Sequence, residues 1–158
     1  MHARSRQSAG CRCTGSTRTG ATSIETALIL VVLVVLIFGM FDLGIAVYRY
    51  TLVSQASRQL ARNAIVRGEM ATQLGRWGPV TYTSAASETH PIPQSIQKYL
   101  GGLDPATTTV RVEWLDGNNR PESRIRATVT TSYEPFITFI FGSPTWNMSG
   151  SSTMQIAH

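Results

Sequence analysis

Cysteine is nearly absent from this sequence of 158 residues. Its two cysteines, Cys11 and Cys13, both lie close to the N-terminus. The rest of the chain therefore has no disulfide, no thiolate nucleophile and no cysteine ligand for a metal. Histidine is also scarce, and the 3 histidines form no pair at metal-binding spacing. We therefore expect neither a metal nor a cofactor.

Sequence signatures of catalysis are missing as well. The chain has no Gly-x-Ser-x-Gly nucleophile elbow, no glycine-rich phosphate loop and no dinucleotide fingerprint. Asp116-Gly117-Asn118 begins like a calcium loop, but Ala127 stands where the closing glutamate is required. We therefore interpret these residues as an ordinary turn, and we expect that the protein is not an enzyme.

Acidic residues are absent from residues 1–20, which hold four of the 14 basic residues: Arg4, Arg6, Arg12 and Arg18. In the rest of the chain the remaining basic residues nearly balance the 9 acidic ones, so this short segment carries most of the net charge of +5. A basic segment beside an apolar one marks the cytoplasmic side of a membrane helix. Because the positive charge is confined to this short segment and the rest of the chain is nearly neutral, we do not expect nucleic acid as a partner.

No charged residue occurs between Glu25 and Asp42. Leu, Ile, Val and Phe fill twelve of the intervening positions, which favours membrane insertion by about 4 to 7 kcal/mol. We predict a transmembrane helix over residues 21–48, preceded by a cytoplasmic basic leader over residues 1–20. Membrane lipid is then a partner, and the C-terminal part of the chain lies outside the cytoplasm.

The helical pattern continues beyond the apolar stretch. Apolar residues recur every four positions, at Tyr48, Leu52, Ala56, Leu60 and Ala64. No proline or glycine interrupts residues 45–67, and Gly68 is a suitable C-cap. We predict one helix from about Thr22 to Arg67, whose extracytoplasmic continuation over residues 49–68 supports an outer α+β domain over residues 69–158.

A cleaved secretory signal is the alternative to a permanent anchor. Gly44-Ile45-Ala46 has the small-x-small form that signal peptidase can use. Cleavage there would give a mature protein that begins at Val47. The continuing helical pattern favours the uncleaved anchor.

Three stretches in the C-terminal third alternate with period two: Val110–Trp114, Arg124–Tyr133 and Trp146–Ile156. Turn residues 116–121 join the first two as a hairpin. The apolar face of such a sheet requires a cover, and the amphipathic helix is available. We therefore predict an α+β, pilin-like fold, in which a long N-terminal helix packs on a small three-stranded antiparallel sheet. Residues 69–106 are expected to be loop with a short helix near Ser95–Leu100.

The connection between the last two predicted strands is unusually apolar, and it contains Phe136, Phe139 and Phe141. Two interpretations remain open. These side chains pack in the core of the outer domain, or they form an interaction loop that contacts a neighbouring subunit or the membrane surface.

Residues 20–25, Gly-Ala-Thr-Ser-Ile-Glu, follow the basic leader and precede the apolar helix. This arrangement resembles the processing site of type IV pilins, where a prepilin peptidase cuts after the glycine. Together with residues 38–44 and 56–62, it resembles the TadE-like family of pseudopilins from tight-adherence (Tad) pili. The resemblance covers about residues 18–68.

The resemblance implies a minor pilin or assembly factor of a Tad/Flp-type adhesive pilus (type IVc), a secreted fibre, and a single-pass location in the bacterial inner membrane. Its implied partners are the prepilin peptidase, other pilin and pseudopilin subunits and the Tad assembly machinery. The alternative function is a membrane-anchored extracytoplasmic binding domain that does not enter a fibre.

Gly20, Ala21 and Glu25 are the processing residues that the resemblance implies. Two compatible roles are open for Glu25. It forms a capping box with Thr22, and after cleavage its carboxylate pairs with the new ammonium of Ala21 on a neighbouring subunit.

Asp42 is the second acid in apolar surroundings. It is either an intramembrane group that acts in subunit packing or the mark of the outer headgroup boundary. Gly39 and Gly44 flank it and would let another helix approach closely.

Overall fold

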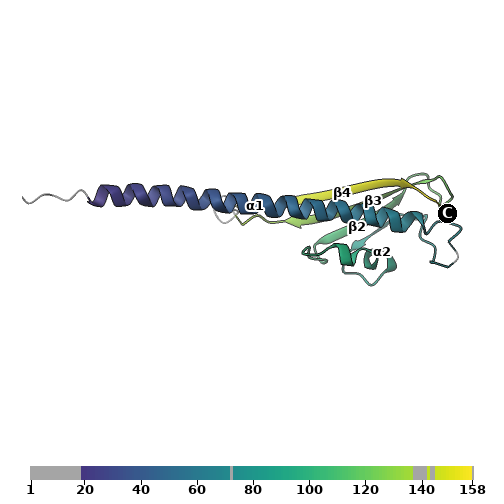
Figure 1. Cartoon of the computed structure of the whole chain (residues 1–158). Helices are drawn as coiled ribbons and strands as arrows, with labels where there is room; N and C mark the ends of the chain where they lie inside the picture. Colours follow the sequence, from purple (N-terminus) through teal and green to yellow (C-terminus); the bar gives the residue numbers. More distant parts are fainter. Residues whose placement is uncertain (1–18, 72, 137–141, 143–144, 158) are drawn as a thin grey trace, which may run out of the picture. The chain divides into compact units, whose positions relative to one another are not determined.

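The computed structural model describes residues 19–71, 73–136, 142 and 145–157. The chain divides into two compact units, residues 1–36 and 37–158. The elements follow in the order α1 (Thr19–Ile65), β1 (Tyr82–Ala85), α2 (Pro91–Gln94), η1 (Gln97–Tyr99), β2 (Thr108–Trp114), β3 (Arg124–Tyr133) and β4 (Trp146–Gln155) (Figure 1).

The helix α1 begins, within the described residues, at Thr19. It is one uninterrupted helix, as the absence of proline predicts. Its start differs from the predicted one, because Thr22 lies inside the helix rather than at the N-cap. The predicted capping box between Thr22 and Glu25 is therefore wrong, since an N-cap residue must stand at the helix boundary.

The helix ends at Ile65, slightly before the predicted Arg67. The backbone N–H of Arg67 donates to the carbonyl of Ala64 at 3.0 Å, which closes a tight turn at once. Gly68 lies beyond this turn, so the prediction that it caps the helix is wrong.

Four antiparallel strands form the sheet, in the order β1-β2-β3-β4, whereas the sequence predicts three. The strands β2, β3 and β4 match the three alternating stretches. The additional strand β1 has four residues, Tyr-Thr-Ser-Ala, of which only Ser84 is buried. Such a short polar stretch has no apolar alternation, so its pairing with β2 defines it as a strand.

The segment between β1 and β2 also contains more structure than the sequence predicts. In place of one helix near Ser95–Leu100, it forms α2 and then η1. His90 caps α2, because its Nδ1 accepts the backbone N–H of Ile92 at 3.3 Å. Both Ile92 and Ile96 are buried, so this segment closes one side of the core.

The core lies between one face of the sheet and the second half of α1, which runs alongside β3 and β4 (Figure 1). The alternation predicted for β2 and β3 is confirmed, since every second residue of both strands is buried. Fully buried apolar residues of α1 recur three or four positions apart at Val53, Ala56, Leu60 and Ala64, and Ala61 beside Leu60 is buried as well. The predicted core residue Tyr48 is instead 57% exposed.

Gly150 in β4 is the point of closest approach between the sheet and α1. A β-carbon at this position would lie 3.0 Å from the carbonyl oxygen of Val53 and 3.1 Å from the Cα of Ser54. Both atoms are backbone and cannot rotate away. Glycine at this position therefore allows α1 to lie directly on β4.

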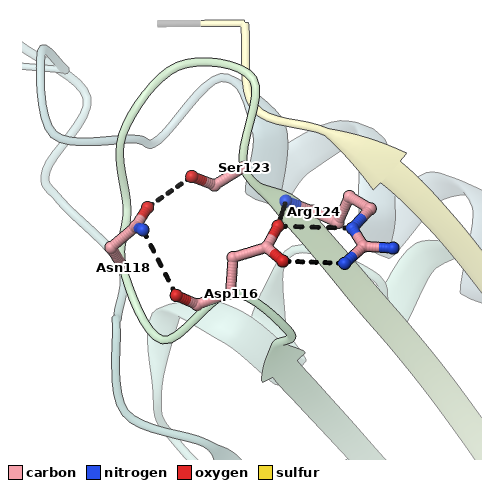
Figure 2. A network of polar contacts seen from close by, with 4 residues as sticks. All are labelled: Asp116, Asn118, Ser123 and Arg124. Carbon is pink, nitrogen blue, oxygen red and sulfur yellow. Dashed lines mark hydrogen bonds and ion pairs between the residues drawn. The ribbon is translucent and has the colours of Figure 1, made fainter.

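A network of polar contacts holds the turn between β2 and β3 (Figure 2). The carboxylate of Asp116 accepts the backbone N–H of Arg124 at 2.7 Å and its guanidinium at 2.8 Å. Asn118 accepts the hydroxyl of Ser123 and donates to the carbonyl of Asp116. The contact with the Arg124 side chain, and then the one with its backbone, lowers the pKa of Asp116. The carboxylate thus serves an ordinary turn.

Replacing Gly150 with Val should destabilise the protein by about 1–3 kcal/mol, because the added side chain must displace the backbone of α1. Unfolding of the detergent-solubilised protein measures the loss. Ser151→Val is the matched control, since Ser151 is exposed on the other face of β4. Equal stability of the two variants would contradict the close packing.

The lowered pKa of Asp116 predicts a small acid-dependent loss of stability. The unfolded carboxyl titrates near its ordinary value of 3.8, and the folded one titrates lower. The stabilisation is therefore complete above pH 4 or so and disappears as the pH falls through the folded pKa. In Asp116→Asn the acid limb of a stability-versus-pH curve should be shallower, while an unchanged limb would argue against the ion pair.

Candidate functional site

The first half of α1 exposes apolar side chains on all sides. At least half of the surface is exposed for Ile24, Leu28, Ile29, Leu30, Val31, Val32, Leu33 and Leu36. A helix of a soluble domain would instead bury one apolar stripe. The helix is long and apolar enough to cross a membrane. This feature fits a single-pass membrane anchor.

The predicted processing residues lie in the first turns of α1. Gly20 is exposed, and a β-carbon there would meet no atom within 4 Å. Ala21 lies next to it on the helix. Glu25 is exposed one turn later, and no hydrogen bond or ion pair to its carboxylate is found within the described residues.

Asp42 is the centre of a buried polar cluster, with only 7% of its surface exposed. Its carboxylate accepts the backbone N–H of Phe136 at 3.0 Å and lies 3.3 Å from the hydroxyl of Tyr133. Tyr133 is the last residue of β3, and Phe136 follows it in the β3–β4 connection. The acid thus ties α1 to the end of the sheet, because a buried carboxylate requires hydrogen-bond donors.

Arg49 belongs to the same cluster, two turns after Asp42 on α1. Its guanidinium carbon lies 4.9 Å from the centre of the Tyr133 ring, a cation–π distance. Burial, followed by the charge of Asp42 and the hydrogen bond to it, raises the pKa of Tyr133. The phenol therefore keeps its proton at neutral pH, and its O–H donates a hydrogen bond to the carboxylate of Asp42.

Two residues predicted for different reasons, Asp42 and Phe136, meet in this cluster. The ring of Phe136 is 75% exposed, so the core interpretation is wrong for this residue. Phe139 and Phe141 lie outside the described residues. Gly39 is half-buried, whereas Gly44 is exposed with open space around it.

Tyr133 is the member of the cluster that sequence reasoning assigned only to a strand. A signal for its role was present in the sequence. Tyr133 ends the inward-facing row of β3, and a buried tyrosine hydroxyl usually requires a partner. Asp42 is the acid at the end of the apolar stretch, so it was a candidate for the hydrogen-bond acceptor of the Tyr133 hydroxyl.

The outer domain also has a shallow hollow of about 320 Å³, at the end of the sheet where β2 and the turn after α1 meet. Its lining includes Arg67, which stacks on Trp77 at 4.4 Å, and His90, which stacks on Tyr82 at 4.4 Å. In the part of the chain that the structure describes, no group of three His, Cys, Asp or Glu side chains could hold a metal ion.

Residues 20–62 match the family model of TadE-like proteins. The chain is TadE-like over this segment. The TadE-like segment contains all of the predicted processing residues as well as Gly39, Asp42 and Gly44, and it ends within the part of α1 that packs on the sheet. The family associates the protein with the machinery of Tad pili. No curated protein and no solved structure matches the chain.

Replacing Asp42 with Ala should leave the Phe136 N–H and the Tyr133 hydroxyl without this acceptor. Loss of a buried partner costs about 1–3 kcal/mol, so the Phe136 amide should exchange its hydrogen roughly tenfold faster or more. Hydrogen–deuterium exchange measures this local change.

Asp42→Asn is the matched variant, because its amide oxygen can still accept the Phe136 N–H. It should therefore exchange more slowly than Asp42→Ala. If both variants exchange like the unchanged protein, the contact does not hold the β3–β4 connection.

Proposed function

We propose that the protein is a minor pilin or assembly factor of a Tad-type pilus. The observation that carries this proposal is the TadE-like match over residues 20–62, which begins at Gly20 and follows the apolar helix. The protein's membrane anchor is α1, with the N-terminus in the cytoplasm and the sheet outside. The inner membrane of a bacterium is the expected location.

Charge and hydrophobicity support the orientation. The arginines of residues 1–20 precede the apolar stretch, and basic residues remain preferentially on the cytoplasmic side. The sheet follows the apolar stretch, so it lies on the opposite side of the membrane. Prepilin peptidase would then meet Gly20 at the cytoplasmic face.

Maturation after Gly20 is the chemical step that the proposal requires. The exposed, unhindered backbone at Gly20 suits a peptidase, which must bind the chain in a conformation other than a helix. Hydrolysis leaves the carboxylate on Gly20 and a new ammonium group on Ala21. Within a fibre this ammonium would pair with the exposed carboxylate of Glu25 on a neighbouring subunit, which offsets the cost of placing either charge in an apolar bundle.

Replacing Gly20 with Val should block maturation, because a branched side chain crowds the bond to be cut. We expect at least about a tenfold loss of the mature form, equivalent to about 1.4 kcal/mol in the cleavage step. Mass spectrometry of the N-terminal peptide, in cells that carry the pilus machinery, should find Ala21 as the first residue of the unchanged protein. Gly44→Val is the control, since Gly44 is also an exposed glycine of α1.

Glu25→Ala separates assembly from maturation. Cleavage should persist, while incorporation into sheared fibres should fall strongly, because the pairing with Ala21 is lost. Normal incorporation would refute the pairing. A mature N-terminus at Val47 would instead support a cleaved signal, and an intact N-terminus with no fibre association would support the membrane-anchored binding domain.

A further inference from the structure

Four exposed aromatic residues adjoin the Asp42 cluster, along α1, through a backbone hydrogen bond or across the β3–β4 ladder. Phe38 and Phe41 stand beside Asp42 on α1, and they are 51% and 65% exposed. Phe136 is bonded to Asp42 through its backbone. Trp146 is 53% exposed and pairs with Tyr133 across the β3–β4 ladder. We call Phe38, Phe41, Phe136 and Trp146 the exit collar.

The position of the exit collar along α1 matches the expected edge of a bilayer. A helix over residues 21–41 is about 30 Å long at 1.5 Å per residue, which equals the usual thickness of the hydrocarbon core. Asp42 is the next residue, and its carboxylate accepts the backbone N–H of Phe136 from the start of the β3–β4 connection. The collar would therefore lie at the depth of the lipid headgroups.

The chemistry of the exit collar also fits this depth. Tryptophan and tyrosine rings concentrate at the membrane–water interface, where an apolar ring with a polar edge is well solvated. Exposed phenylalanine rings, which have no polar edge, bury their apolar surface at the boundary between headgroups and acyl chains. The carboxylate of Asp42 is buried against the protein and accepts hydrogen bonds from the Tyr133 hydroxyl and the Phe136 N–H, which offsets part of the cost of placing it near lipid. Elsewhere on the sheet, the outer face of β4 exposes polar residues: Asn147, Ser149, Ser151, Thr153 and Gln155.

We infer that the exit collar seats the outer domain on the surface of the bilayer, with Phe136 and Trp146 inserted among the lipid headgroups. This inference rests on the proposed membrane anchor and adds a second contact with lipid, made by the sheet end. The exit collar adjoins the exposed apolar side chains of the membrane anchor on α1. This position favours contact with lipid over contact with a second protein subunit.

The three tryptophans allow a direct test in the full-length protein. Trp114 pairs with Ile125 at one end of β3, and Trp146 pairs with Tyr133 at the other. These ends are about 26 Å apart at 3.3 Å per residue. Trp77 lies near Trp114, since Asn119 hydrogen-bonds to both. A reporter variant, Trp77→Phe with Trp114→Phe, keeps Trp146, and a control variant, Trp77→Phe with Trp146→Phe, keeps Trp114.

Both variants are reconstituted into phosphatidylcholine vesicles whose acyl chains carry bromine at a shallow position. Fluorescence from Trp146 should be quenched several-fold more strongly than fluorescence from Trp114. A second change, Phe136→Ser in the reporter variant, should reduce that quenching. Val80→Ser is its matched control, because Val80 is exposed to a similar degree, 78% against 75%, and lies near Trp77. Thermal unfolding verifies that each variant is folded.

Flotation of the vesicles separates the two possible failures. Protein that does not float with lipid overturns both the anchor and the collar. Protein that floats, but with Trp146 quenched no more than Trp114, retains the anchor and overturns the collar. Cross-linking between subunits through position 146 in the same unquenched sample would identify the collar as a protein interface.

Discussion

Contact between the second half of α1 and the apolar face of the sheet is the interaction on which the outer domain depends. The sheet has one buried face, and the buried helical residues are small or branched, among them Val53, Ala56 and Ala64. Small side chains bring a helix backbone close to a strand, and Gly150 reduces the remaining distance. Because β4 lies so close to the backbone of α1 at Gly150, no larger side chain fits at this position without displacing the helix.

The same helix therefore has two different environments along one continuous backbone. Its first half exposes apolar side chains, which only a lipid or a bundle of other helices can cover. Its second half has a narrower apolar stripe that the sheet covers. Asp42 stands where these environments meet, and its carboxylate accepts hydrogen bonds from the Phe136 N–H and the Tyr133 hydroxyl. These bonds connect one position of α1 to the end of β3.

The sequence predicts the parts of this structure that depend on periodicity. The alternation in β2 and β3 and the long helical repeat both follow from burial on one face, which leaves a regular pattern in the residues. The strand β1 could not be predicted, because backbone hydrogen bonds define its pairing and its four residues do not alternate between apolar and polar. The sequence indicates that Asp42 is an unusual acid, but it does not predict the contact with Tyr133. The two residues are distant in sequence, and periodicity carries no information on which buried donor meets which acceptor.

The polar cluster has one consequence for how the outer domain could exist apart from the membrane. The buried apolar residues of α1 begin at Val53, so a chain trimmed to Val47 keeps all of the apolar helical residues of the core. Trimming would, however, remove Asp42 and with it the acceptor of the Phe136 N–H. A secreted fragment of this kind would keep the hydrophobic core, but the start of its β3–β4 connection would no longer be bonded to α1. Release from the membrane would then also remove the contact that positions Phe136.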